Sequence, residues 1–213
     1  LNNMSKNKNN KPIWGTRIKK NASTLFKKVG GSLPIDKILF KEDIEGSIAH
    51  VEMLYKQKII NFRIKNKIIW GLKRINNEII KKKFKFNYDL EDIHMNIESR
   101  LFELIGEDAG YIHTARSRND QVITDLKLWL KKATKKIIIL LDSTNSNILK
   151  LATKNVMTIM PGFTHLKNAQ PVSLAHYFMA YIEMFKRDKR RFINNLESLN
   201  ENPLGVAALV GTS

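Results

Sequence analysis

The chain has 213 residues, no cysteine and a formal net charge of +17. This length is enough to bury one larger hydrophobic core or two smaller ones, so we expect one or two domains. The lack of cysteine excludes disulfides, zinc-thiolate sites and thiol nucleophiles, and it fits a cytoplasmic protein.

The positive charge is spread along the chain rather than gathered in one segment. Scattered lysines are typical of solvated surfaces, so no nucleic-acid partner is expected. Because a high positive charge can also favour nucleic acid, a basic helical nucleic-acid-binding module is an alternative. A positive field also suits a small anionic substrate. Apolar runs such as residues 137–141 are far shorter than the about 20 residues of a membrane span, so no membrane partner is expected.

The first half of the chain shows short amphipathic segments. Residues 1–11 are polar, and we expect a disordered lead-in before an N-terminal helical domain over residues 12–111. Asp36 and Asp89 each stand just before a periodic segment and are expected N-caps. The three apolar stripes are Ile44, Ile48, Val51 and Tyr55; Ile68, Leu72, Ile75 and Ile79; and Ile93, Ile97, Leu101 and Leu104.

The second half, residues 112–213, is expected to be the first part of a helical-bundle domain. Its pattern predicts long helices over about 119–151 and 171–199, with Pro171 in the first turn of the second helix. Between them, residues 160–165 contain a Pro-Gly pair and are expected to form a loop or an irregular extended segment. Because alternating strand patterns are almost absent, the fold class is all-α. The stripe of the first long helix is Val122, Leu126, Trp129, Ala133, Ile137 and Leu140.

Two segments carry candidate chemistry. Residues 113–121 place two arginines, a serine and Asn119 at the start of a helix, where side chains and free amides hold carboxylates or phosphates; capping alone is the alternative. Thr164-His165 is a candidate proton-transfer pair, since histidine takes either protonation state near neutral pH. A structural or surface histidine is the commoner case.

Two further motifs predict structure rather than chemistry. The Glu91-x-x-His94 pair matches half of a di-iron site, but no second pair exists, so we expect the first turn of a helix there and no metal. Residues 205–211 bear glycines without the Lys-Ser/Thr of a phosphate loop, which indicates close packing or a turn.

Several of these segments follow one another in a characteristic order. They are Trp14-Gly15-Thr16-Arg17, Ser32-Leu33 with Asp36, Asp43-Ile44 with Gly46-Ser47, Glu91-Asp92-Ile93-His94, residues 113–121 with Thr124-Asp125-Leu126, Met160 to Leu166, Ala169-Gln170-Pro171-Val172, and Pro203-Leu204-Gly205. In order and approximate spacing they resemble the argininosuccinate lyase family. Residues 116–121 are highly specific to that family, whereas Thr164-His165 is shared with the wider fumarase and aspartase superfamily.

The resemblance implies a fumarase/aspartase-like fold whose long helices form the central bundle of a homotetramer, with active sites shared between subunits. It implies cofactor-free elimination of fumarate from argininosuccinate to give L-arginine, a step of arginine biosynthesis. His165 matches the proton-transfer histidine, and Arg118 is the carboxylate partner. The other implied substrate-binding residues are Ser32, Asn119 and Thr164. The family's catalytic serine loop lies outside these 213 residues, so we expect an N-terminal fragment that is inactive alone.

The chain departs from the family at four places. Thr16, Ala115 and Ala207 replace glycines, and each is strained by about 1 kcal/mol or more if its φ is positive. Lys167-Asn168 replaces Gln-Arg and puts a cation beside the Thr-His pair. Fumarase, aspartase and adenylosuccinate lyase are alternatives within the superfamily, and a non-catalytic structural protein, like the lens crystallins recruited from this family, is another.

Overall fold

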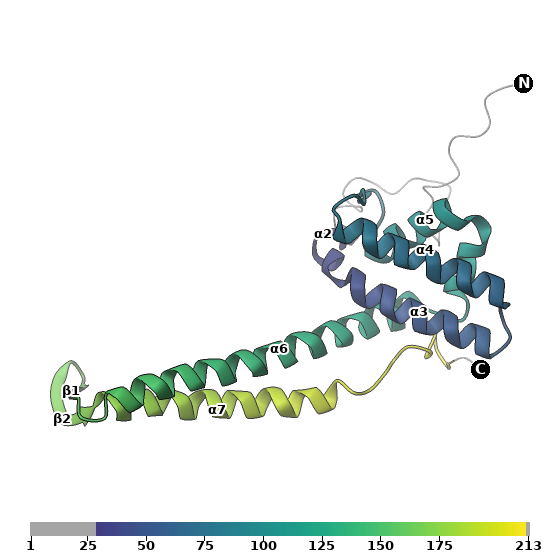
Figure 1. Ribbon diagram of the computed structural model, residues 1–213. Coiled ribbons are helices and arrows are strands. Elements are labelled where there is room, and N and C mark those ends of the chain that lie inside the picture. Colours follow the sequence, from purple (N-terminus) through teal and green to yellow (C-terminus); the bar gives the residue numbers. More distant parts are fainter. Residues whose placement is uncertain (1–28, 212–213) are drawn as a thin grey trace, which may run out of the picture. The chain divides into compact units, whose positions relative to one another are not determined.

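The computed structural model describes residues 29–211 as two compact units (Figure 1). Unit 1 comprises residues 29–126 and 203–211, and unit 2 comprises residues 127–202. Both are mostly helical, which confirms the all-α class. The lead-in over residues 1–11 and the segment with Thr16 lie outside the described residues. The predicted boundary between residues 111 and 112 falls inside a 3-10 helix and stays a prediction about domains.

Unit 1 is built from short helices with local caps. Asp92 caps α5 by accepting a hydrogen bond from Met95 N at 2.6 Å, so the prediction of Asp89 as this cap is wrong. Asp36 precedes η1 but makes no capping bond. The elements are α2 (Leu33–Asp36), the 3-10 helix η1 (Lys37–Leu39), α3 (Phe40–Lys56), α4 (Phe62–Ile80), α5 (Ile93–Ile105), the 3-10 helix η2 (Gly106–His113) and the start of α6 (Arg118–Lys154).

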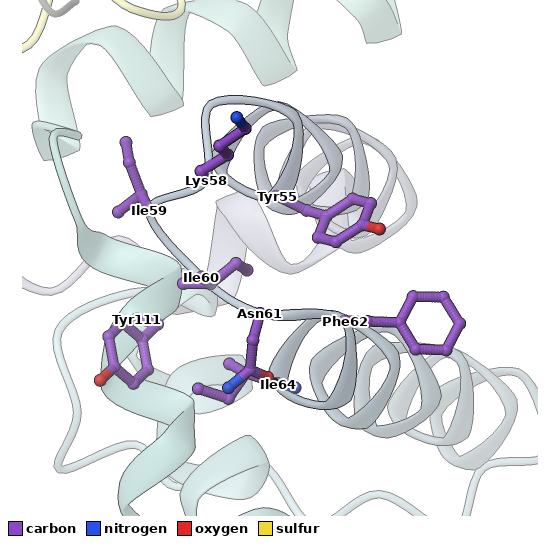
Figure 2. Close-up of a pocket in the computed structure, with 8 residues that line it drawn as sticks. All are labelled: Tyr55, Lys58, Ile59, Ile60, Asn61, Phe62, Ile64 and Tyr111. Atoms are coloured by element: carbon purple, nitrogen blue, oxygen red, sulfur yellow. Dashed lines mark hydrogen bonds between the residues drawn. The ribbon is translucent and has the colours of Figure 1, made fainter.

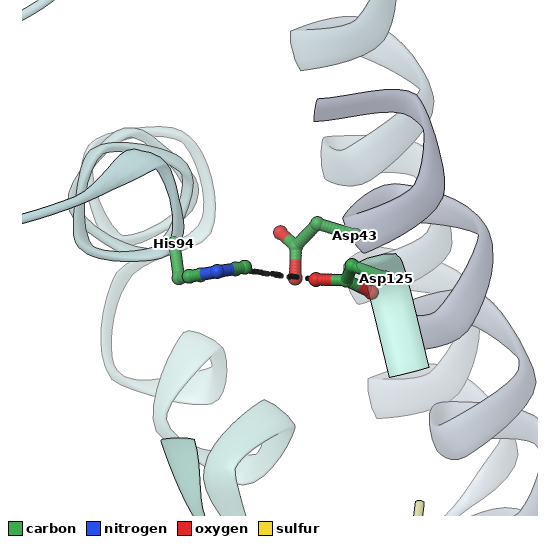
Figure 3. Close-up of side chains that lie close together, drawn as sticks. All are labelled: Asp43, His94 and Asp125. Carbon is green, nitrogen blue, oxygen red and sulfur yellow. Dashed lines mark hydrogen bonds and ion pairs between the residues drawn. The ribbon is translucent and has the colours of Figure 1, made fainter. Parts of the chain in front are cut away.

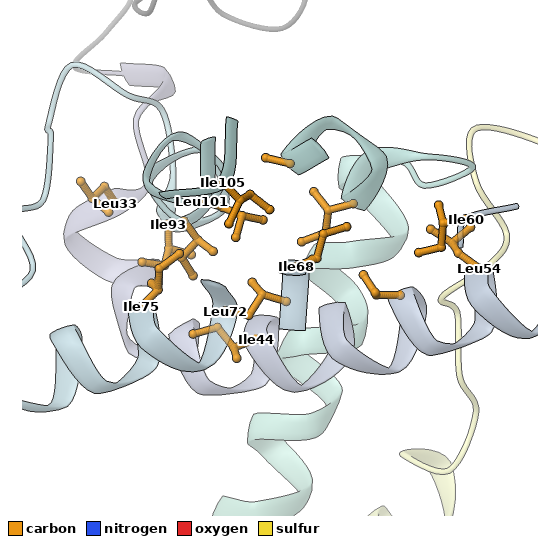
Figure 4. Close-up of a cluster of buried hydrophobic side chains, with 14 residues drawn as sticks. Leu33, Ile44, Leu54, Ile60, Ile68, Leu72, Ile75, Ile93, Leu101 and Ile105 are labelled. Atoms are coloured by element: carbon orange, nitrogen blue, oxygen red, sulfur yellow. The ribbon is translucent and has the colours of Figure 1, made fainter. Parts of the chain in front are cut away.

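The three predicted stripes meet in the core of unit 1 (Figure 4). Val51, Ile68 and Ile97 are fully buried there, whereas Tyr55 at the end of the first stripe is exposed. Each buried aliphatic side chain stabilises the fold by about 1.5–3 kcal/mol. Gly71 lets α4 approach α5 closely, because a Cβ at this position would overlap a methyl group of Leu101.

Unit 2 carries a β-hairpin that the sequence pattern did not predict. Strand β1 (Ile159–Thr164) pairs antiparallel with β2 (Lys167–Ser173), and α7 (Leu174–Ser198) follows. The expected first-turn position of Pro171 is wrong, because this residue lies in β2 opposite Pro161. Ser173 is the N-cap of α7 and accepts a hydrogen bond from His176 N at 3.1 Å.

Helices α6 and α7 run side by side within unit 2 (Figure 1). Lys189 Nζ on α7 lies 2.7 and 2.8 Å from the two carboxylate oxygens of Asp142 on α6. Two helices enclose little volume, and large apolar residues such as Ile139 and Leu140 are 67% and 54% exposed. Among the described residues, no helix combines the length and the apolar character that crossing a membrane requires.

Candidate active site

The start of α6 is held by a reciprocal cap. Ser117 Oγ accepts a hydrogen bond from Asn119 N at 3.3 Å, and Asp120 Oδ1 accepts one from Ser117 N at 3.1 Å. The other oxygen of Asp120 accepts from the N–H groups of Gly205 and Ala207 at 3.3 and 2.7 Å. The glycine-bearing stretch is therefore a turn tied to α6, and capping accounts for part of the polar density of this segment.

Arg118 is fixed by acidic and amide groups. Its Nε lies 3.1 Å from Asp92 Oδ2, and its Nη1 lies 3.2 Å from Glu98 Oε1 and 2.6 Å from Gln121 Oε1. Within the described part of the chain, Nη2 has no hydrogen-bond partner. Nη2 of Arg118 is therefore a guanidinium nitrogen that is buried in this chain and lacks a partner among the described residues, whereas the adjacent Asn119 is exposed.

Ser32 reaches the same neighbourhood through the first turn of α5. Its N–H donates to Glu91 O at 2.8 Å, and its Oγ donates to Asp36 Oδ2 at 2.5 Å. The second oxygen of Asp36 accepts a hydrogen bond from Ile93 N at 3.2 Å. Because Arg118 contacts Asp92, the N-cap of α5, two of the predicted site residues, Ser32 and Arg118, lie at the start of α5 in unit 1, and Asn119 follows Arg118 in the chain.

Thr164 and His165 belong to the hairpin of unit 2. His165 and Leu166 form its two-residue turn, with φ values of 51° and 64°, and Thr164 stands directly opposite Lys167. Two successive left-handed residues are typical of a type I′ hairpin turn, and they cost conformational energy in residues other than glycine. Directly opposite side chains project from the same face of a hairpin, so Lys167 and Thr164 share one face beside His165.

A buried polar cluster joins α3, α5 and α6 in unit 1 (Figure 3). His94 Nδ1 lies 3.0 Å from Asp43 Oδ1 and 3.5 Å from Asp125 Oδ2, and all three side chains are at most 2% exposed. Asp43 Oδ1 also accepts a hydrogen bond from Gln121 Nε2. Asp125 Oδ2 has no hydrogen-bond partner in the described structure.

The two carboxyl groups of the cluster differ in protonation. Burial alone would raise the pKa of Asp43, but the charge and hydrogen bond of His94, with Arg116 and Gln121, outweigh it and lower that pKa to about 2. Burial and the negative charge of Asp43 raise the pKa of Asp125 to about 8. For His94, burial is outweighed by Asp43, so its pKa is raised. The cluster thus favours the negative charge on Asp43 and the proton on Asp125.

The donor set of this cluster is also the one set in the described residues whose ligand atoms lie close enough for a metal, within 4.8 Å of one another. Two carboxylates and an imidazole fit a small divalent cation in type. However, the facing oxygen of Asp43 is taken up by two hydrogen bonds, and the positive charge of Arg116 acts on both carboxylates. The arrangement favours protons over a metal ion.

The sequence pattern missed this cluster because the buried face of α6 in unit 1 is polar. Gln121, Thr124 and Asp125 are buried, whereas Val122 is half-buried and Leu126 is 39% exposed. The apolar stripe predicted through Val122 and Leu126 therefore does not face the interior of unit 1. The signal in the sequence was the Gln121 and Asp125 pair, four residues apart on one helical face.

A separate hollow lies beside the turn between α3 and α4 (Figure 2). Its volume is 610 Å³, and its lining includes Tyr55, Lys58, Phe62 and Tyr111. None of the predicted site residues lines it. It combines aromatic and aliphatic surface with one lysine and lacks an acid–base pair.

The sequence model of a family described as Lyase matches residues 16–213. The chain belongs to this lyase family. It is 70% identical over 210 residues to the argininosuccinate lyase of Pelagibacter ubique, covering 99% of this chain and 46% of that relative. It is 52% identical over 202 residues to that of Ehrlichia chaffeensis, covering 95% of this chain and 43% of the relative. The chain thus spans less than half the length of these relatives.

Solved structures of EDDS lyase share the fold. The crystal structure of EDDS lyase in complex with formate has a TM-score of 0.72 and 27% identity, covering 84% of this chain and 35% of that one. A variant of EDDS lyase with bound fumarate has a TM-score of 0.72 and 25% identity, covering 92% of this chain and 39% of that one. The predicted fumarase/aspartase-like architecture is confirmed.

Proposed function

We propose that the protein containing this chain is an argininosuccinate lyase, which eliminates fumarate from argininosuccinate and releases L-arginine in the cytoplasm. The observation that carries the proposal is the 70% identity to an argininosuccinate lyase over 99% of this chain. The donors gathered at the start of α5 in unit 1 support it, because the substrate is a polycarboxylate.

The reaction explains why such donors are needed. A base removes a proton from the carbon next to a carboxylate, and the resulting carbanion-like species carries extra negative charge that preset cations and hydrogen-bond donors stabilise. The bond between the neighbouring carbon and the guanidino nitrogen then breaks, and an acid protonates the leaving nitrogen. No oxidation occurs, so the reaction requires no redox cofactor.

Each predicted residue has a role in this scheme. Nη2 of Arg118 binds a substrate carboxylate, and Ser32, Asn119 and Thr164 supply hydrogen-bond donors. His165 takes part in proton transfer, and it is exposed in the turn of the hairpin. The two groups of residues lie in different units, and we propose a homotetramer in which several subunits contribute to each site. The exposed apolar faces of α6 and α7 support such an assembly.

The decisive experiment is an assay of fumarate absorbance with the full-length protein. Argininosuccinate is compared with malate, aspartate and adenylosuccinate, the substrates of the alternative superfamily members. We expect fumarate and arginine in equal amounts from argininosuccinate alone, and a loss of at least about a hundredfold in His165→Asn. Release from another substrate of the panel, or from none, would refute the proposal.

A further inference from the structure

We infer that Asp43 is a positioning residue of the substrate site and that it acts through Gln121 on Arg118. The inference rests on the proposed function for its consequence in catalysis. The three side chains form one chain of hydrogen bonds: Gln121 Nε2 donates to Asp43 Oδ1, and Arg118 Nη1 donates to Gln121 Oε1 at 2.6 Å. Asp43 and Gln121 are each 2% exposed, so neither contacts solvent to an important degree.

The polarity of this chain is fixed by its two ends. An ionised carboxylate only accepts hydrogen bonds and a guanidinium only donates them, whereas a side-chain amide does both through different atoms. Gln121 therefore has one orientation in which both neighbours are satisfied, with its nitrogen toward Asp43 and its oxygen toward Arg118. Loss of the negative charge at Asp43 removes the reason for that orientation.

The orientation of Gln121 decides which nitrogen of Arg118 is free. Nε is paired with Asp92, and Nη1 is shared between Glu98 and Gln121, which leaves Nη2 without a partner among the described residues. If the amide of Gln121 flipped, its nitrogen would face Nη1 and two donors would meet. Arg118 would then have to turn, and with it the nitrogen proposed to bind the substrate carboxylate.

Asp125 and the surrounding charges keep the negative charge on Asp43. Asp43 has two hydrogen-bond donors, His94 and Gln121, whereas the facing oxygen of Asp125 has none among the described residues. The ligand atoms of the two carboxyl groups lie within 4.8 Å of each other in a buried cluster, so two negative charges there would repel each other strongly. Asp125, which lacks donors, is therefore the group that keeps its proton. The other charged groups that act on the cluster are Asp36, Glu42, Asp92, Arg116 and Arg118.

A charge-conserving double substitution tests the inference in the full-length protein. Asp43→Asn removes the acceptor charge, and Gln121→Glu places a carboxylate against a carboxylate. Together they move the negative charge from position 43 to position 121. The two N–H groups of the amide at position 43 then donate to the new carboxylate and to Nδ1 of a neutral His94, and the carboxylate at position 121 also accepts from Arg118. We expect each single variant to raise KM for argininosuccinate about tenfold or more, and the double variant to recover most of that loss.

The controls separate positioning from general damage. Asp108→Asn, at a half-exposed ion pair in the same unit, should leave KM and the unfolding temperature near wild type. A folded Gln121→Glu with wild-type KM, or a double variant no better than the worse single variant, would overturn the inference. If Asp43→Asn alone does not fold, recovery of folding and KM in the double variant decides.

The test remains informative if the proposed function fails. Inactivity of the wild-type protein toward argininosuccinate would count against the function only. The same four proteins would then be compared by thermal unfolding and by hydrogen exchange of the Arg118 Nε–H group. Non-additive unfolding temperatures, with fast exchange in the single variants and slow exchange in the double, support the positioning chain; additive effects and unchanged exchange refute it.

Discussion

Ala115 and Ala207 are held in a conformation that alanine disfavours, and replacing each with glycine should stabilise the protein. Their φ values are 56° and 53°, within the left-handed region. The left-handed region costs a residue with a Cβ about 1–2 kcal/mol, which glycine relieves. Glycine also makes the unfolded chain more flexible, and this destabilises the folded state by about 0.4–1 kcal/mol. The net gain is about 1 kcal/mol per site.

The backbone contacts at these sites should survive the substitution. Ala207 N donates to Asp120 Oδ2 at 2.7 Å, and glycine retains that N–H group. Ala115→Gly and Ala207→Gly together should therefore add about 2 kcal/mol if the sites act independently. With a denaturant slope of about 2 kcal/mol per molar urea, the unfolding midpoint rises by about 1 M.

The assay is urea unfolding of the wild type, both single variants and the double variant at one fixed protein concentration, because assembly makes midpoints depend on concentration. The matched control is Ala49→Gly on the exposed face of α3, where glycine in a regular helix should cost about 1 kcal/mol. If the glycine variants at 115 and 207 shift the midpoint downward, as the control does, the strain argument is wrong.

Four other expectations follow from the structure. The pKa of Asp125 is raised to about 8 from an ordinary 3.8, so the stability that this carboxyl group contributes is complete below about pH 4 and is lost as the pH rises to about 8. The Asp125→Asn variant should therefore gain stability relative to wild type as the pH rises through that window. A difference in unfolding temperature that does not change with pH would contradict this expectation. Gly162→Ala should disrupt the hairpin, because the added Cβ would lie 2.7 Å from Gln170 O; circular dichroism and activity measure the loss, and wild-type activity would count against this packing. The full-length enzyme should be active but slow, and Lys167→Gln should raise kcat/KM while Lys154→Gln leaves it unchanged; equal effects of both would remove any special role for Lys167. The 213-residue chain alone should associate or aggregate through the apolar faces of α6 and α7, and a soluble monomer in size-exclusion chromatography would show the opposite.

The helices of unit 1 were predictable because their signals are local. The stripes through Val51, Ile68 and Ile97 lie at helical spacing, and burial of one apolar face fixes both the element and its inner side. Cap assignment was less reliable. Asp89 and Asp92 are both suitable N-caps before α5, and the choice between them depends on where the backbone leaves the preceding turn.

The hairpin was not predictable from periodicity. Its strands are almost wholly exposed, so no alternation of apolar and polar residues marks them, and a proline in each strand argues against a sheet. Pro161 and Pro171 are tolerated because a two-stranded hairpin consists of edge strands only. The expectation of an irregular extended segment over residues 160–165 agrees with the bulged strand β1, whereas the predicted helix start at Pro171 was wrong.

For the candidate site, the residue types could be read from the sequence alone: a donor-rich helix start around Arg118 and Asn119, and an imidazole beside Thr164. Which of these groups are already engaged depends on the packing of the helices, since Arg118 is held by Asp92, the N-cap of α5, and by Glu98 within α5. Helical periodicity gives the faces of a helix but not what each face meets. The partner of Gln121 is Asp43, 78 residues away along the chain, and only the folded structure brings the two together.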